Sequence, residues 1–161
     1  MTNCLECGGE MTTARENFKY VASGLPYITL VNVEVSRCSA CGEFEVTIPY
    51  IEDLHRTIAY AVAAKKARLA PEEIRYLRKW LGWSQTDFAA HAGVDPATVS
   101  RWENDSVAMG GSAERLLRLL VTTREPVQKY SLDILKQIDD KKTPPIRLGV
   151  QAEAGGWRVA A

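Results

Sequence analysis

The spacing of apolar residues in the first third of the chain is typical of β-strands. Residues 27–35 are rich in β-branched and aromatic side chains, and residues 44–48 alternate apolar with polar positions. Both patterns lie within a stretch, residues 18–48, in which strand signals gather. Gly24–Pro26 and Ser39–Gly42 have the composition of turns. We therefore expect a small β structure in this part of the chain.

From residue 51 the apolar spacing becomes helical. Over residues 51–68, apolar side chains recur every three or four positions, at Ile51, Leu54, Ile58 and Val62. Pro71 would end this helix or begin the next one. Residues 71–123 alternate short helical stretches with Gly and Asp-Pro, and residues 126–138 predict one more helix.

The pattern from residue 139 onward leaves two expectations open. This tail contains Pro144-Pro145 and Gly155-Gly156, which favour either disorder or a short hairpin. In the second case the turn would fall around Ala154–Gly156, with Trp157 as the anchoring side chain.

Composition describes a globular chain, and the charge is unevenly distributed. Of 161 residues, 46% are hydrophobic and 25% charged, which excludes a disordered class, and 20 basic residues balance 20 acidic ones. Residues 1–50 hold three basic and six acidic residues, whereas residues 51–124 hold eleven basic and nine acidic. Zero net charge is therefore no argument against a nucleic-acid partner. No apolar run reaches membrane-spanning length and residues 1–10 lack a secretory pattern, so we expect no membrane contact and a cytoplasmic location.

Four cysteines form two pairs, and each pair is followed by glycine. The pairs are Cys4-x2-Cys7 and Cys38-x2-Cys41. Two intervening residues let both sulfurs of a pair reach one ion, and the glycine lets the backbone turn and point amides at the thiolates. Four thiolates form a closed tetrahedral site, so one structural Zn²⁺ per chain is expected, and a region of about 50 residues needs such a crosslink. An iron–sulfur cluster, a redox pair and disulfides remain the alternatives.

Residues 71–104 predict three short helices, of which the second and third form a helix-turn-helix unit. The boundary residues are Pro71, Gly82, Ser84 with Asp87 as a capping box, Gly93, and Asp95 with Pro96. Ala89 is small enough to let the two helices approach each other. The apolar positions expected to hold them together are Phe88, Val94, Val99 and Trp102.

With Val99 and Trp102 turned inward, the third helix presents its other face outward. The candidate DNA-contacting residues are Gln85, Ala97, Thr98, Ser100, Arg101 and Asn104. Arg101 can bond guanine edges, Thr98 can contact a base edge or a thymine methyl, and Gln85 is placed to bond a phosphate. Further attraction to phosphate is expected from Arg75, Arg78, Lys79, Arg115 and Arg118. The alternative is a helical bundle on which these residues form only a solvated face.

No enzyme is expected from this sequence. It contains no phosphate loop, paired-carboxylate site or catalytic triad, and neither His55 nor His91 has a nucleophile at catalytic spacing. His55 is expected to have a surface or packing role. Trp80 and Trp83 are expected to belong to the core.

Two known classes of protein resemble this sequence. Residues 84–104 resemble the DNA-binding domain of Xre and phage-repressor regulators. A tetracysteine segment followed by such a domain resembles the MqsA (YgiT-type) antitoxin family. The resemblance covers residues 3–124 and rests on the cysteine pairs and on Glu72–Arg78, Ser84-Gln85 and Val99–Glu103.

The resemblance implies a zinc-bound N-terminal domain that can hold a toxin, and a second domain that dimerises and represses an operator. The reading residues would then be Ala97, Thr98, Ser100 and Arg101. The sequence departs from the pattern at Ala70, where a Ser or Thr cap is usual, and at Pro96 and Ala97, where amide or hydroxyl side chains are common.

We therefore expect an α+β fold in four parts. These are a tetracysteine zinc-binding β domain (1–50), a linker helix (51–70), a phage-repressor-like helix-turn-helix domain (71–138) and a tail or hairpin (139–161). The expected function is a homodimeric repressor of a palindromic operator, acting as the antitoxin of a type II toxin–antitoxin system and autoregulating its operon. The alternatives are a stand-alone Xre-type regulator whose cysteines sense metal or oxidant, and an adaptor whose zinc domain binds a protein.

Overall fold

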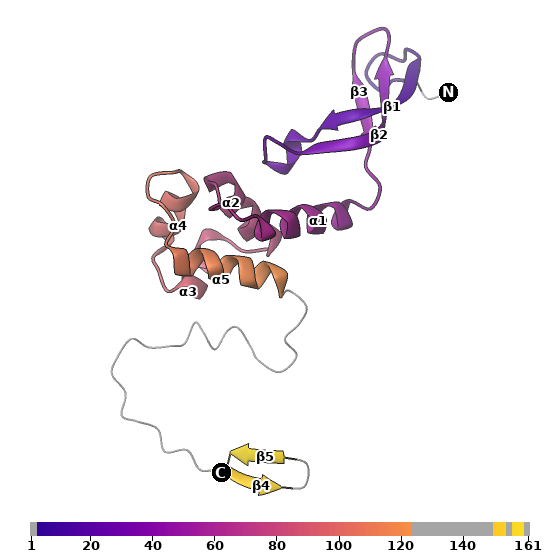
Figure 1. Ribbon diagram of the computed structural model, residues 1–161. Helices are drawn as coiled ribbons and strands as arrows, with labels where there is room; N and C mark the ends of the chain where they lie inside the picture. The colour runs from indigo at the N-terminus through magenta and orange to yellow at the C-terminus, as the bar shows by residue number, and fades with distance from the viewer. Residues whose placement is uncertain (1–2, 124–149, 154–155, 160–161) are drawn as a thin grey trace.

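The computed structural model describes residues 3–123, 150–153 and 156–159 (Figure 1). It has an α+β architecture in which a small antiparallel sheet precedes five helices. The sheet contains β1 (Met11–Lys19), β2 (Thr29–Cys38) and β3 (Phe44–Thr47), with the 3-10 turn η1 (Val21–Ser23) between the first two. The helices are α1 (Ile51–Ala64), α2 (Pro71–Trp80), α3 (Gln85–Ala92), α4 (Pro96–Glu103) and α5 (Gly111–Thr122). A separate pair of strands, β4 (Val150–Glu153) and β5 (Gly156–Val159), follows.

The sheet has the order β1-β2-β3, and its pairing brings the two cysteine pairs to one end. Met11 pairs with Cys38 at that end, and Lys19 pairs with Thr29 at the other. β3 pairs with only the last part of β2. The predicted strands 27–35 and 44–48 are therefore confirmed with shifted ends.

The first half of β1 lies outside the stretch in which strand signals were found. Residues 11–17 are mostly polar, and in this half-strand Met11 alone is buried. These residues become a strand because their backbone pairs with β2 along nearly its whole length. The alternation of apolar and polar side chains that would have predicted it is absent.

The far end of the sheet and the helices share one apolar core. Tyr20, Leu25 and Leu30 from the sheet region are buried in the same cluster as the inner face of α1. That face consists of Ile58, Ala59, Val62 and Ala63. The helix that was predicted to link two parts therefore packs between them, as Figure 1 shows, while the domain boundaries themselves stay a prediction.

The predicted capping box, glycine turn and packing residues of the helix-turn-helix region are confirmed. The Ser84 side chain accepts a hydrogen bond from the Asp87 N–H, and the Asp87 carboxylate accepts one from the Ser84 N–H. Gly93 has a φ of +67°, which a left-handed turn requires. Asp95 precedes α4 as expected, although its side chain makes no capping bond. The predicted packing residues are buried at Phe88, Ala89, Val99 and Trp102 and half-buried at Val94.

Three buried glutamates, which the sequence analysis did not predict, tie the helices together. Glu73 accepts hydrogen bonds from Lys65, Tyr27 and the Ala70 N–H. Glu103 pairs with Arg78, and Glu114 pairs with Arg68 and Arg118. Each carboxylate therefore has cationic partners that offset the cost of its burial.

Two arginines that were predicted to attract phosphate have structural roles instead. Arg78 is buried, donates two hydrogen bonds to the Glu103 carboxylate and donates a third to the Trp83 carbonyl oxygen at 2.7 Å. Arg118 donates to Glu114, to the Ala63 carbonyl oxygen in the last turn of α1, and to the Lys65 and Ala67 carbonyl oxygens after it. The prediction failed because a guanidinium can reach a buried carboxylate or a helix end as readily as DNA, and only the packing decides which.

The hairpin alternative is confirmed for the tail. β4 and β5 pair antiparallel from Val150 with Val159 to Glu153 with Gly156. The helix predicted over residues 126–138 and the role of the Trp157 side chain lie outside what the structure describes. Within the described residues, no helix is long and apolar enough to cross a membrane.

Candidate functional site

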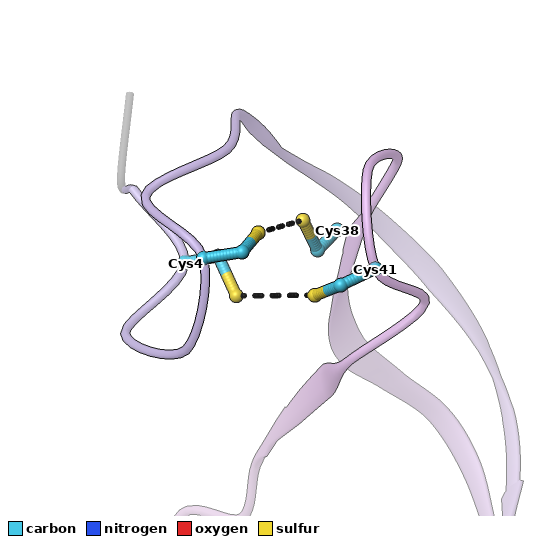
Figure 2. Close-up of side chains that lie close together, drawn as sticks. Cys4, Cys38 and Cys41 are labelled. Carbon is cyan, nitrogen blue, oxygen red and sulfur yellow. Dashed lines mark hydrogen bonds between the residues drawn. The ribbon is translucent and has the colours of Figure 1, made fainter.

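The four cysteine sulfurs meet at one end of the sheet (Figure 2). Cys4 Sγ lies 3.6 Å from Cys41 Sγ, Cys7 Sγ lies 3.4 Å from Cys38 Sγ, and all four sulfurs are within 4.8 Å of one another. Four thiolates at about 2.3 Å from one tetrahedral ion are about 3.8 Å apart. The sulfur positions therefore fit a single metal ion held by both pairs.

Two similar turns hold the cysteine pairs. The Gly8 N–H donates to the Cys4 carbonyl oxygen at 2.9 Å, and the Gly42 N–H donates to the Cys38 carbonyl oxygen at 3.1 Å. Both glycines have positive φ values, +72° and +78°. The expected role of glycine after each pair is thus confirmed, since a residue with a side chain rarely adopts this conformation.

Backbone amides and neighbouring sulfurs give the thiols different acidities. Hydrogen bonds from the Cys41 and Ala40 N–H groups lower the pKa of Cys38 to about 6, against the effect of burial. The pKa of Cys41 is raised to about 12, because its bonds to the Cys7 and Cys38 sulfurs outweigh the Glu43 N–H, which lowers it. Four crowded sulfurs ionise together most readily around a cation, which is the condition that a metal ion supplies.

The centre has a buried side and an open side. Cys4 and Cys38 are buried, whereas Cys7 and Cys41 are exposed, and none of the four forms a disulfide. All four thiols could bind one metal ion. Four thiolates would fill a tetrahedral coordination sphere, so the metal would have no open position for a substrate.

The second candidate site is the outer face of α4. Val99 and Trp102 are buried beneath this helix, while Ala97, Arg101 and Asn104 are exposed at its surface. Thr98 and Ser100 are half-buried at its sides. The expected orientations are therefore confirmed for Val99, Trp102, Ala97, Arg101 and Ser100, whereas Thr98, which was expected to point outward, is half-buried. The Arg101 side chain makes no hydrogen bond or ion pair with any described residue, so its five donors are available to a ligand.

Hydrogen bonds link the remaining candidate residues to their neighbours. Gln85 donates one Nε2 hydrogen to Glu103 Oε2 at 2.9 Å, and its second Nε2 hydrogen could donate to a ligand. Asn104 donates from Nδ2 to Ser100 Oγ at 3.3 Å and accepts from Arg75 Nη2 at 3.2 Å. The i,i+4 spacing of Ser100 and Asn104 is the sequence signal that could have predicted the first of these contacts.

The second candidate site lies within a segment that matches a known protein family. Residues 74–120 match the model of a helix-turn-helix family. The chain carries an Xre-type helix-turn-helix domain. Domains of this family bind DNA in transcription regulators, and the match spans α2 to α5, including the turn at Gly93. The comparison with curated proteins finds no match to this chain.

The other predicted residues are placed as follows. Lys79 and Arg115 are exposed, and neither makes an ion pair with a described residue. His55 lies between two phenols, with Nε2 at 3.2 Å from the Tyr20 hydroxyl and Nδ1 at 3.0 Å from the Tyr76 hydroxyl. The packing role expected of His55 is thus confirmed. Trp80 and Trp83 are half-buried against the apolar core, as predicted.

Proposed function

We propose that this protein is a sequence-specific transcriptional repressor that binds its operator as a homodimer. The observation that carries this proposal is the outer face of α4 within the matched helix-turn-helix domain, where Arg101 is exposed and has no partner among the described residues. An α-helix fits the major groove of B-DNA, and arginine there bonds guanine through two donors. Two copies would place their α4 helices about 34 Å apart on a palindromic site.

Six residues form the proposed contact surface. They are Gln85, Ala97, Thr98, Ser100, Arg101 and Asn104. Arg101 and Thr98 would read base edges, and the Gln85 amide would bond a phosphate at the start of α3, where backbone N–H groups favour an anion. The hydrogen bond that Asn104 Nδ2 donates to Ser100 Oγ would hold both polar groups on the same side of α4.

We propose that the cysteines hold one structural Zn²⁺. Tetrahedral sulfur sites suit zinc, and the short sulfur–sulfur distances fit one ion better than a multi-iron cluster, in which the thiolates bind different metal atoms. The ion crosslinks the start of the chain to the end of β2. The backbone also joins these segments through the pairing of Met11 with Cys38, but the buried cluster described at this end is small and consists of Cys4, Met11 and Cys38. A bound ion would therefore add the main crosslink between side chains.

We propose further that the protein is the antitoxin of a type II toxin–antitoxin pair, with the sheet as the toxin-binding part. Support comes from large apolar side chains that the sheet region exposes. Leu5 is 90% exposed, Val31 72% and Val21 62%. Val21 and Val31 lie towards one end of the sheet and Leu5 lies in the turn of the first cysteine pair at the other end, so a protein partner that covers all three would extend along the sheet.

A second candidate function is favoured by the open side of the metal centre. Because Cys7 and Cys41 are exposed, a chelator or an oxidant can reach their sulfurs directly. A regulator that senses metal or oxidant would lose operator affinity when the metal is removed. A structural metal in an antitoxin would leave the affinity of an intact helix-turn-helix domain largely unchanged.

The proposed function is tested by measuring binding to DNA from the region upstream of the protein's own gene. Fluorescence anisotropy at fixed salt gives the dissociation constant for the full-length protein. Arg101→Ala should cost about 1–3 kcal/mol of binding free energy and relax specificity at one base position in each half-site. Arg56→Ala is the matched control, because Arg56 is exposed on α1 and pairs with Asp53.

Three outcomes separate the candidates. Equal operator affinity for the Arg101→Ala and wild-type proteins contradicts the proposed reading role. Failure to bind any upstream DNA, together with capture of a protein partner, favours the adaptor alternative. Co-purification of the chain with the product of an adjoining small gene, with DNA binding insensitive to chelation, supports the antitoxin.

A further inference from the structure

A cavity of about 470 Å³ lies where the sheet region meets α1 and α2. Its walls come from three segments: Ser23 and Gly24 beside η1, His55 of α1, and one face of α2. The residues that α2 contributes are Glu72, Arg75, Tyr76, Lys79 and Trp80. This volume is within the range of small-molecule sites in proteins.

We propose that this cavity binds an organic anion with a flat apolar body, such as an aromatic carboxylate. Arg75 and Lys79 are four residues apart on α2, and both line the cavity. The Arg75 guanidinium bonds Glu103 and Asn104, so an anion held by Lys79 would have to draw Arg75 away from α4 before both cations could contact it. Trp80 supplies an aromatic wall for the rest of the ligand. Both cations are exposed, and Lys79 forms no ion pair with a described residue.

The uncharged polar side chains His55, Tyr76 and Ser23 of the cavity already have partners, and Lys79 is the lining cation that forms no ion pair with a described residue. Both ring nitrogens of His55 face phenol hydroxyls, and Ser23 Oγ donates to the Tyr20 carbonyl oxygen. Glu72 is the one acidic residue among those lining the cavity. It lies seven residues before Lys79, or about 10 Å along the helix axis, and so marks the end of the cavity that an anionic group would avoid.

Arg75 connects this cavity to the proposed DNA-binding face. Its Nη2 donates to the Glu103 carbonyl oxygen at 2.9 Å and to Asn104 Oδ1 at 3.2 Å, and Asn104 in turn bonds Ser100. An anion that draws Arg75 into the cavity would release Asn104 Oδ1 and would break the 3.6 Å ion pair between Arg75 Nε and Glu103 Oε2. The ligand would then act as an inducer that weakens operator binding. This part rests on the proposed function, whereas ligand binding to the cavity does not.

Binding is tested with sodium benzoate as the probe, by isothermal titration calorimetry on the full-length, metal-loaded protein at constant ionic strength. We expect saturable binding of one benzoate per chain. Benzamide has the same shape without the charge and should bind far more weakly. Lys79→Ala should weaken benzoate binding about threefold to fivefold, because it removes an attracting charge. Glu72→Gln should strengthen benzoate binding about twofold, because it removes a repelling charge. Lys66→Ala, an exposed lysine outside the cavity, is the control and should change nothing.

Thermal unfolding of each variant confirms that it is folded before its affinity is compared. The proposal is overturned if benzoate does not bind saturably, if benzamide binds equally well, or if Lys79→Ala and Lys66→Ala have the same affinity. Lys79→Ala is expected to lower the affinity for benzoate and Glu72→Gln to raise it. A general loss of stability cannot produce both changes.

The link to DNA is tested by repeating the operator-binding measurement with benzoate and, for comparison, sodium chloride at the same ionic strength, because any salt weakens DNA binding. Benzoate should weaken operator binding more than chloride does, and more strongly in Glu72→Gln than in wild type. Benzoate binding without any DNA binding contradicts the proposed function and leaves the ligand site standing. DNA binding with no benzoate binding contradicts the ligand site alone.

Discussion

Gly9 is the residue whose size most directly limits the metal centre. A Cβ atom at this position would lie 3.1 Å from Cys38 Sγ, 3.2 Å from Cys7 Sγ and 3.0 Å from Ala40 Cβ. These distances are shorter than ordinary van der Waals contacts. The Gly9 N–H also donates to Cys7 Sγ at 3.4 Å. Glycine therefore lets the first turn approach the second closely enough for four sulfurs to meet.

Gly9→Ala should weaken metal binding, because the added methyl group would push the two cysteine pairs apart. We expect faster loss of metal to a chromogenic chelator and about 1–3 kcal/mol lower stability of the metal-loaded protein. Gly110→Ala is the control, since Gly110 has a φ of −64° and open space around its Cα. Equal rates of metal release from both variants would contradict the proposed limit on size.

At the scale of elements, the contact between α2 and α4 fixes the position of the proposed reading helix. Arg78 Nε and Nη2 donate to the two oxygens of Glu103 at 2.5 and 3.0 Å, and both side chains are buried. Gln85 from α3 donates to the same carboxylate. One buried ion pair thus joins three helices of the helix-turn-helix domain.

Arg78→Ala should destabilise the fold by about 3–5 kcal/mol, because the Glu103 carboxylate would stay buried without its main partner. Chemical denaturation followed by circular dichroism measures this change. Arg56→Ala removes an arginine from an exposed ion pair and should cost less than about 1 kcal/mol. A small effect of Arg78→Ala would mean that Arg75 and Gln85 satisfy the carboxylate without Arg78.

Across the whole molecule, the three buried glutamates give stability a defined dependence on pH. Burial by itself raises the pKa values of Glu73, Glu103 and Glu114, but their hydrogen bonds and nearby cations outweigh it, so all three pKa values are lowered. A carboxylate with a lowered pKa in the folded state stabilises the fold above its unfolded pKa. That stabilisation is lost as the pH falls through the folded-state value.

We therefore expect the free energy of unfolding to be nearly constant around neutral pH and to decrease as the pH falls below about 5. Denaturant midpoints measured across the acidic range test this. Glu114→Gln should lower stability at neutral pH and make the acid-induced loss less steep. Glu34→Gln, on the exposed surface of β2, is the matched control. If the free energy of unfolding of Glu114→Gln and of the wild type decreased equally steeply with falling pH, the expected contribution of Glu114 would be contradicted.

Patterns local in the chain could be predicted from the sequence, and long-range pairing could not. The cysteine spacing, the capping box at Ser84 and Asp87 and the left-handed turn at Gly93 all depend on neighbours within a few residues. The first half of β1 has no such pattern, because it is held by pairing with a strand far along the chain. Arg78 and Arg101 are both helical arginines in the sequence, yet Arg78 is buried and paired with Glu103, whereas Arg101 is exposed.

The sequence by itself therefore determined the two cysteine pairs with their glycine turns, the helix-turn-helix and the outward position of Ala97 and Arg101 on its third helix, because spacing and helical period decide these locally. Only the tertiary structure decided which charges are free to bind a ligand. It pairs Arg78 and Arg118 with buried carboxylates, leaves Arg101 and Lys79 exposed, and places Arg75 between a cavity and α4. The physical reason is that a long cationic side chain can reach many partners, and packing determines which of them is within reach.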